Sequence, residues 1–380
     1  NAVPQFRNLD RYYQQLGTVY RIVKSINPSV QVYSYTVAPG RKYGSPPVDA
    51  SGNNLFLDGK LAGEHGPDWV EKMLQYYAQH PYSSTQPIPV DGIGINLYFP
   101  WQIKLYTDDL HTSLAKYHAS HLKIFVGETG LPTRAENNVI WDTHSNTLSD
   151  QATYIWQNFS LMYAKGISQF NYFYARDTEM VPTGNDHWGL FTYEGQPRPA
   201  YNAFLFAQRV FSDIQSVDYK EDNGVSITTI LRNDGNRVRI VWNSTNNFGG
   251  AQTQARSLTD IPTEVTIFDK YGNKVTPQKG ENGLNELSLP IPNTAWIGGE
   301  VFIIFDQPGS NQESITDTQN KTAANSNVSQ GKRMPGMAKL LPLTTTAEED
   351  AFTQLNTPYV KGGARGGVAT PQDGGLANIG

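Results

Sequence analysis

The chain has 380 residues, no cysteine, 30 lysine and arginine residues and 35 aspartate and glutamate residues, for a formal net charge of −5. That length allows two or three domains with real cores, and the charge excludes a protein that binds nucleic acid through a concentrated basic surface. The absence of cysteine excludes a disulfide scaffold, a thiol nucleophile and cysteine-ligated metal sites.

Residues 1–211 alternate helical and strand patterns. Apolar residues recur at helical spacing up to Asn27 and Pro28, where the helix ends because proline disfavours helical geometry in the residue before it. Strands are expected at 30–37, 92–98, 123–128 and 170–174, with a helix before each and a last helix at 199–211. Alternating helix–strand units favour a parallel α/β sheet, and four units amount to half of a (β/α)8 TIM barrel. We therefore predict the C-terminal half of a TIM barrel for 1–211.

Residues 212–306 change to short strands separated by turns. Asp234 and Gly235 lie between two alternating runs, which is a strong hairpin signal, and several such strands predict an accessory β-sandwich. Residues 307–380 contain few aromatic residues and no periodic pattern, so they cannot build a core of their own. We predict a low-complexity extended tail that contacts a neighbouring subunit. The fold class is then α/β plus all-β, and the apolar runs are too short for a membrane span.

Glu128 stands out as a chemical group because it ends the strand predicted at 123–128. In a (β/α) barrel, polar residues at the carboxyl ends of strands face the mouth of the active site. Gly127 and Gly130 lie beside Glu128, and we interpret these small residues as room for a ligand. The other interpretation is structural, with Glu128 capping a loop or forming an ion pair with Arg134.

Further polar and aromatic residues follow the predicted strand ends. The candidate ligand-binding residues are Asn96, Tyr98, Trp101, Tyr174, Asp177, His187 and Trp188. Tyr98 can donate a hydrogen bond to an ionised Glu128, which would keep that carboxylate available as a nucleophile. Each of these residues alone is more often part of a core or rim, but together they predict an aromatic-walled pocket centred on a carboxylate.

Four runs resemble a known family. They are 91–98, 125–130, 188–191 and 197–204. In this order they resemble strands six to eight and the closing helix of retaining glycoside hydrolases in the large (β/α)8-barrel clan of β-xylosidases, β-galactosidases and cellulases. The resemblance implies that Glu128 is the nucleophile and that Tyr98 orients it. Asn96 stands where these enzymes often have histidine, and Tyr174 lies near where many carry a tryptophan under the sugar.

The resemblance also implies a partner for Glu128. Retaining hydrolysis uses two carboxyl groups about 5–5.5 Å apart, and in this clan the acid/base glutamate ends strand four, just before the helix that here begins near Leu9. That position is upstream of Asn1. We therefore expect a missing N-terminal half-barrel, either in the same gene product or in a separate chain. No metal ion or organic cofactor is implied, because the two carboxyl groups suffice.

Two functional hypotheses remain open at this point. In the first, the chain is the C-terminal portion of a retaining β-glycosidase that acts on a polysaccharide or glycan. In the second, it is a catalytically incomplete, glycosidase-like structural or carbohydrate-binding subunit of an extracellular or virion assembly. An Asn-Glu pair upstream of Asn1 would favour the first. Both place the protein outside the cell or at its surface. The N-glycosylation sequons at Asn158, Asn243, Asn320 and Asn327 matter only if the source glycosylates its proteins.

Overall fold

The computed structural model describes residues 9–36, 56–57, 60–61, 66–133, 146–167, 169–177, 187–244, 254–292 and 297–306. The predicted tail at 307–380 and Arg134 lie outside these residues, so the predictions for them stay untested. None of the helices in the described ranges has both the length and the apolar character needed to cross a bilayer.

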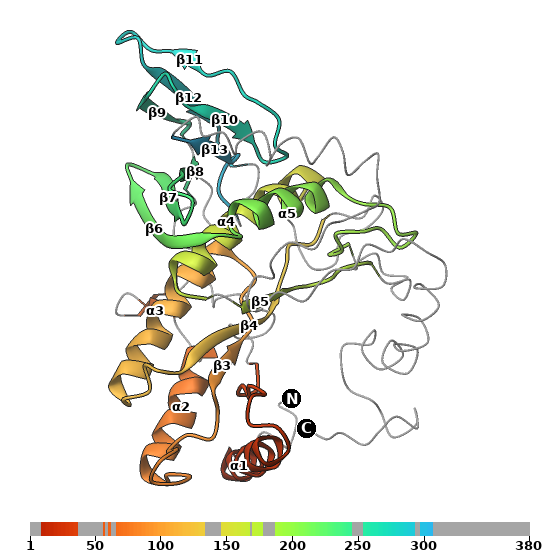
Figure 1. Cartoon of the computed structure of the whole chain (residues 1–380), viewed down its shortest axis with the longest axis vertical. Coiled ribbons are helices and arrows are strands. Elements are labelled where there is room, and N and C mark those ends of the chain that lie inside the picture. The colour runs from red at the N-terminus through yellow and green to blue at the C-terminus, as the bar shows by residue number, and fades with distance from the viewer. Residues whose placement is uncertain are drawn as a thin grey trace.

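The first part of the chain alternates helices with a parallel sheet (Figure 1). The helices are α1 (Leu9–Ile26), α2 (Gly66–Gln79), α3 (Pro100–Lys116), α4 (Leu148–Ala164) and α5 (Pro199–Val210). The parallel strands are β3 (Gly92–Ile95), β4 (Lys123–Thr129) and β5 (Gln169–Tyr172), in that order across the sheet. A short antiparallel pair, β1 (Phe56–Leu57) and β2 (Lys60–Leu61), lies between α1 and α2 in sequence. The predicted alternation of helix and parallel strand is confirmed for these elements.

The strand predicted at 30–37 appears in its described part as a single parallel bridge between Tyr33 and Gly92 of β3. The sheet is curved enough for the Tyr33 hydroxyl to reach across β3 and β4. It donates a 2.8 Å hydrogen bond to the side-chain oxygen of Gln169 in β5. The Tyr33 ring also lies 5.1 Å from that of Phe125 in β4. A Cβ at Gly92 would lie 2.5 Å from the Tyr33 ring, so glycine is required where this ring fills the concave side.

The second part of the chain is all antiparallel. One sheet has the order β10-β13-β8-β7-β6 and another the order β11-β12-β9. Their bounds are β6 (Ile214–Asp222), β7 (Val225–Arg232), β8 (Arg237–Asn243), β9 (Arg256–Ile261), β10 (Thr266–Asp269), β11 (Gln278–Lys279), β12 (Asn285–Leu289) and β13 (Phe302–Phe305). The predicted hairpin is confirmed at β7 and β8, where Gly235 has a φ of 82°. Val241 and Ile304 of the larger sheet share an apolar cluster with Leu287 and Leu289 of the smaller one.

Helices α4 and α5 lie between the parallel sheet and the antiparallel sheets (Figure 1). Trp156 of α4 donates from Nε1 to the carbonyl oxygen of Lys270 at 2.8 Å. Gln157 donates to the carbonyl oxygen of Gly299 at 2.9 Å and accepts from the backbone N–H of Gly298 at 2.8 Å. One apolar core includes Trp156 as well as residues of β8 and β13, such as Ile240. The core therefore continues across the boundary predicted at residue 211.

Two of the predicted sequons are buried structural positions. Asn158 and Asn243 are 1% and 0% exposed. Asn158 donates to the hydroxyl of Tyr154 at 2.6 Å, and Asn243 donates to the carbonyl oxygen of Gln254 at 3.0 Å. The folded protein cannot present these side-chain amides to a glycosylating enzyme. Both asparagines instead serve the packing of the core.

Candidate active site

Glu128 and Tyr98 meet at the carboxyl edge of the parallel sheet. β3 and β4 are paired up to Ile95 and Val126, and beyond them the backbone N–H of Leu97 donates to the carbonyl oxygen of Glu128 at 3.1 Å. This pairing brings the next side chain, Tyr98, beside Glu128, and the Tyr98 hydroxyl donates a short hydrogen bond to Oε2 of Glu128.

The Tyr98 hydroxyl is held in its protonated form. Burial raises its pKa above the ordinary value for tyrosine, and the hydrogen bond to Glu128 and the charge of Glu128 raise it further. Tyr98 therefore donates and Glu128 accepts as a carboxylate, since a hydrogen bond to the charged acceptor is of the strong, charge-assisted kind. Among the described residues, the Glu128 side chain accepts this hydrogen bond through Oε2.

Aromatic rings form a wall beside this pair. The Trp188 ring meets the Tyr98 ring edge-on, with centroids 5.6 Å apart, and meets the Phe173 ring at 5.7 Å. Tyr174 follows Phe173, and the rings of these two residues are in contact, with centroids 3.7 Å apart. The structure thus brings together Glu128 near the end of β4, Tyr98 after β3 and Trp188, with Phe173 and Tyr174 completing the wall beside Trp188.

Asp177 and His187 are engaged mainly with the protein itself. Asp177 is buried, forms a salt bridge with Arg198 and accepts from the backbone N–H of Gly189 at 2.7 Å. Arg198 also donates from Nη2 to Nδ1 of His187 at 2.9 Å, and 38% of the His187 side chain is exposed. The same ring nitrogen lies 3.4 Å from Oδ2 of Asp177, so both members of the buried pair contact His187. Asp177 and Arg198 therefore position the segment that carries His187 and Trp188.

Gln151 of α4 has no exposed surface, and it holds the segment that carries His187 and Trp188. Its side-chain nitrogen donates to the carbonyl oxygens of Leu131 and Trp188, both at 3.1 Å. Thr133 adds a backbone hydrogen bond to the carbonyl oxygen of His187 at 2.9 Å. The sequence reasoning missed Gln151 and the role of Arg198. Polar residues on the buried face of an otherwise apolar helix are the signal that could have identified Gln151.

A buried network lies directly behind Glu128. The hydroxyls of Thr129 and Tyr154 are 2.8 Å apart, and Asn158 donates to both of them. Burial raises the pKa of Tyr154 well above its ordinary value, so the phenol stays neutral within the network. The end of β4 is thereby tied to α4 at the residue that follows Glu128.

The interpretation of the flanking glycines as room for a ligand is wrong. A Cβ at Gly127 would lie 2.4 Å from the Thr36 methyl group, and one at Gly130 would lie 2.2 Å from the carbonyl oxygen of Phe173. Both glycines are therefore required by close approach of the chain to itself. Asn96 lies next to Gly127, and its side-chain oxygen is buried without a hydrogen bond among the described residues.

Trp101 lies in the core and has no exposed surface. Its ring is stacked with Phe99 at 6.3 Å and meets Tyr106 edge-on at 6.0 Å. It therefore offers no face to a ligand in this structure. Among the residues described, no three histidine, aspartate or glutamate side chains gather in a way that could hold a metal ion.

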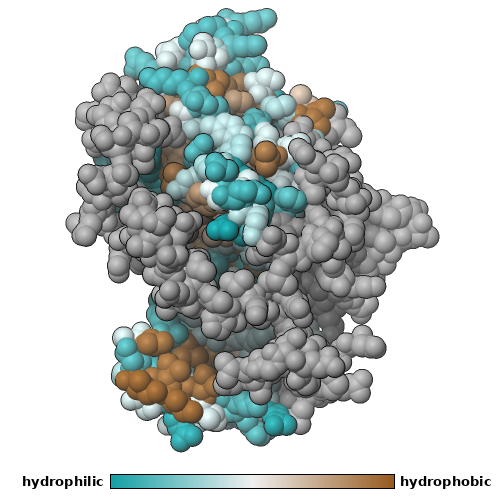
Figure 2. All heavy atoms as spheres, turned by 90° about the vertical axis from the view of Figure 1, so that its right-hand side faces the viewer, coloured by the Kyte–Doolittle hydropathy of each residue, from teal (hydrophilic) through white to brown (hydrophobic). Residues whose placement is uncertain are grey.

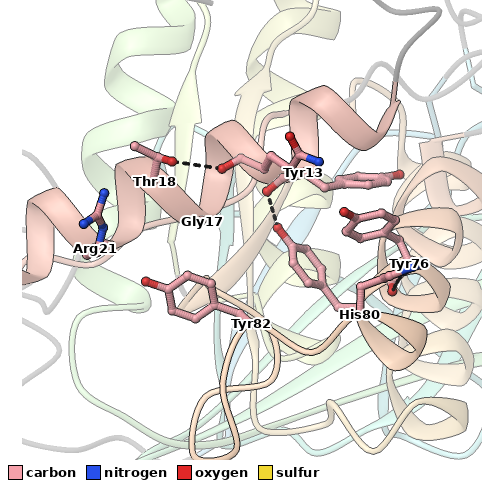
Figure 3. A pocket seen from close by; sticks show the side chains of 9 residues that line it. Tyr13, Gly17, Thr18, Arg21, Tyr76, His80 and Tyr82 are labelled. Atoms are coloured by element: carbon pink, nitrogen blue, oxygen red, sulfur yellow. Dashed lines mark hydrogen bonds between the residues drawn. The ribbon is translucent and has the colours of Figure 1, made fainter.

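The pocket drawn in Figure 3 lies away from Glu128, between α1 and α2. It has a volume of about 260 Å³ and is lined by Tyr13, Gln14, Gly17, Thr18, Arg21, Tyr76, Tyr77, His80 and Tyr82. The Tyr77 hydroxyl donates to the carbonyl oxygen of Tyr13 at 2.6 Å, which joins the two helices. The residues that line this pocket belong to α1, α2 and the segment after α2. None of them is at the carboxyl edge of the sheet, where Glu128 lies.

No family model matches this chain, and no curated protein matches it. Among solved structures it is similar to a family 39 glycoside hydrolase from Bacteroides cellulosilyticus WH2, at 18% identity and a TM-score of 0.50 over 77% of this chain and 54% of that one. Similar structures also include a glucosidase from Croceicoccus marinus (13% identity, TM-score 0.47, 78% and 64% covered). A monomeric β-xylosidase from Caulobacter crescentus CB15 is a third (13%, 0.45, 78% and 66%).

The chain spans between 54% and 66% of the length of these three structures. The first of these structures, at a TM-score of 0.50 over 77% of this chain, shows the fold. The chain accordingly has a glycoside-hydrolase-like fold.

Proposed function

We propose that this chain is the C-terminal portion of a retaining β-glycosidase, with Glu128 as its nucleophile. The observation that carries the proposal is the hydrogen bond from Tyr98 to Glu128 at the carboxyl edge of a curved parallel sheet. A carboxylate held in one orientation by a neutral phenol has one oxygen fixed and the other available for attack. The rings of Trp188 and Tyr174 beside it suit the apolar face of a sugar.

The reaction proceeds in two steps and needs a second carboxyl group. Glu128 attacks the anomeric carbon and forms a glycosyl ester, while the second group, as an acid, donates a proton to the leaving oxygen. That group then removes a proton from water, which attacks the anomeric carbon and releases Glu128. We assign the second group to an upstream half-barrel that carries strands one to four, in the same gene product or in a separate chain. The coverage of 54% of the family 39 structure supports this assignment.

The proposed substrate is a polysaccharide or glycan outside the cell or at its surface. Neutral sugars have apolar ring faces and hydroxyl groups, which match an aromatic wall with phenol and amide groups nearby. Trp188 supplies a ring of this wall, and Tyr98 supplies a phenol beside it.

A catalytically incomplete structural or carbohydrate-binding subunit is the second candidate. The observation that favours it is that two of the predicted ligand-binding residues serve the fold, since Trp101 is a core residue and Asp177 is paired with Arg198. Such a subunit would keep the Glu128 and Tyr98 contact without turnover, because a fold persists when its chemistry is lost.

The test is covalent trapping of the nucleophile with an activated 2-deoxy-2-fluoro glycoside. It uses the natural polypeptide, meaning the protein as its source makes it, with the proposed upstream half-barrel. This probe forms the glycosyl ester but hydrolyses slowly, so peptide mass mapping should find the added sugar on Glu128. Glu128→Gln should abolish both labelling and turnover, whereas Glu281→Gln, in an exposed turn, should change neither. Turnover without a label on Glu128, or turnover retained in Glu128→Gln, contradicts the nucleophile assignment. Sugar binding with no turnover supports the binding subunit.

A further inference from the structure

The pocket between α1 and α2 has a closely packed floor, made by the buried residues Tyr13, Gly17 and Tyr77 (Figure 3). The Tyr77 hydroxyl donates to the carbonyl oxygen of Tyr13 at 2.6 Å, and the centroids of the two rings are 5.8 Å apart. A Cβ at Gly17 would lie 3.1 Å from the Tyr82 ring, so glycine allows α1 to approach the segment after α2. Because the chain's own contacts hold this floor, the pocket is already formed before a ligand arrives, as is usual for small-molecule sites.

Aromatic rings stand at the rim of this pocket. Tyr82 is 37% exposed, and its ring meets the Tyr20 ring edge-on with centroids 6.0 Å apart. The His80 ring is stacked with the Tyr76 ring at 4.7 Å, and Nδ1 of His80 lies 3.2 Å from the carbonyl oxygen of Tyr76. Both Tyr82 and His80 are therefore held in place by a neighbour while they remain exposed. Rings fixed in this way at a surface suit the apolar face of a sugar.

Polar side chains of α1 line the same pocket. Gln14, Thr18 and Arg21 recur at i, i+4 and i+7, which places them on one side of the helix. A different side of α1 carries Val19 and Ile22, which are 47% and 50% exposed. Figure 2 shows an apolar patch low on the molecule, at the level of α1 in Figure 1. An amide, a hydroxyl and a guanidinium group are thus gathered at the pocket, and together they can bind the hydroxyl groups of a sugar.

The pocket is positively charged. Among the described residues that line it, Arg21 is charged and none is an aspartate or glutamate. Within the described ranges, no carboxylate is paired with Arg21. Lys24, three residues further along α1, lies 2.8 Å from Asp91, so this ion pair adds no net charge. A guanidinium group is a bidentate donor for a carboxylate, and a carboxylate is the group that the described lining does not supply.

We propose that this pocket binds a uronic acid unit of a glycan, at a second site separate from Glu128. The sugar ring packs against the rings of Tyr82 and His80, and its carboxylate binds the guanidinium group of Arg21. The pocket volume of about 260 Å³ is below the roughly 300–1,000 Å³ of sites for drug-sized ligands, so it suits a single sugar unit. A glycan with neutral and acidic units can occupy both sites, which raises its effective concentration at Glu128.

Calorimetric titration of the natural polypeptide tests this site, with trigalacturonate as the acidic probe and xylotriose as the neutral one. The protein carries Glu128→Gln throughout, which prevents turnover of either sugar. Arg21→Gln should weaken trigalacturonate binding about fivefold, because an exposed ion pair is lost, and should leave xylotriose binding unchanged. Lys220→Gln is the matched control, since it removes an exposed positive charge from β6, and it should change neither dissociation constant.

A second pair of variants tests the ring instead of the charge. Tyr82→Ala removes a ring from the rim and should weaken trigalacturonate binding about tenfold. Tyr82→Phe keeps the ring and should retain most of the binding. Arg21→Gln and Tyr82→Phe should both leave the melting temperature unchanged, because Arg21 and Tyr82 are exposed.

The site does not depend on the proposed function, and the outcomes keep the two apart. Trigalacturonate binding that depends on Arg21, with no sugar label on Glu128, means that the pocket binds an acidic glycan in a protein that does not hydrolyse it. The proposal is overturned if trigalacturonate does not bind, or if neither Arg21→Gln nor Tyr82→Ala weakens its binding. An equal effect of Arg21→Gln on both sugars also overturns it, because the carboxylate would then have no part in recognition.

Discussion

At the residue scale, the hydrogen bond from Tyr98 to Glu128 determines what the site can do. Tyr98→Phe removes the donor and keeps the ring that meets Trp188, so the wall should persist while the carboxylate loses its orientation. A hydrogen bond to a charged group is worth about 1.5–3 kcal/mol, so kcat/KM of the complete enzyme should fall by about 10- to 150-fold. Steady-state kinetics on an aryl glycoside measure this.

The control for this prediction is Tyr82→Phe. Tyr82 is an exposed tyrosine that lines the pocket between α1 and α2 and lies away from Glu128. Removing the Tyr82 hydroxyl should leave kcat/KM unchanged. An unchanged kcat/KM in Tyr98→Phe as well would mean that the phenol has no part in orienting Glu128.

Some residue-level features followed from the sequence and others did not. The placement of Tyr98 near Glu128 could be predicted, because adjacent parallel strands bring their carboxyl ends to one edge of the sheet. The reason for Gly127 and Gly130 was not, because it depends on Thr36 and Phe173, which are distant in the chain. Nor does any local pattern tell a ring on the surface from a buried ring such as Trp101.

At the element scale, the pair of Asp177 and Arg198 links the end of the parallel sheet to the start of α5 and to the segment with Trp188. Both side chains are buried, with 6% and 7% exposed. Arg198→Met removes the arginine partner of the buried Asp177 carboxylate, which should cost about 3–5 kcal/mol of unfolding free energy. Urea unfolding measures this loss.

Adding Asp177→Asn to Arg198→Met should recover part of that loss, because the amide removes the buried charge. Arg176→Met is the matched control, since Arg176 is exposed and lies over the Tyr193 ring. A loss in Arg198→Met no greater than in Arg176→Met would show that the pair does not hold the segment.

Most of the helices and strands could be predicted from the sequence, because the spacing of their apolar residues matches the helical or the strand period. Helices and strands with a buried face carry their spacing in the sequence, as in α4 and in the hairpin of β7 and β8. β6 was not predicted, because it is a mostly exposed edge strand whose residues alternate little in polarity. β9 was also missed, and it is held by pairing with β12, a partner distant in the chain.

At the scale of the whole molecule, the continuity of the core could not be seen from the sequence. The change from helix–strand units to short strands predicts a boundary at residue 211, and that boundary between domains stays a prediction. The contacts across it depend on residues more than a hundred positions apart, such as Gln157 with Gly298 and Gly299. Buried polar contacts of this kind fix one relative arrangement, because each unpaired group would be costly.

The continuous core predicts that the parallel and antiparallel parts unfold together. Trp156 is fully buried, meets Phe206 edge-on with centroids 5.0 Å apart, and donates to Lys270 across the junction. Trp156→Ala should therefore cost about 3–5 kcal/mol, and amide hydrogen exchange should show the loss in both β4 and β8. Trp69→Ala, at a partly exposed position beside Lys72, should cost less. Protection of β8 that survives Trp156→Ala unchanged would mean that the two parts are independent, because an element that shares the core cannot keep its full stability when the core loses one of its tryptophans.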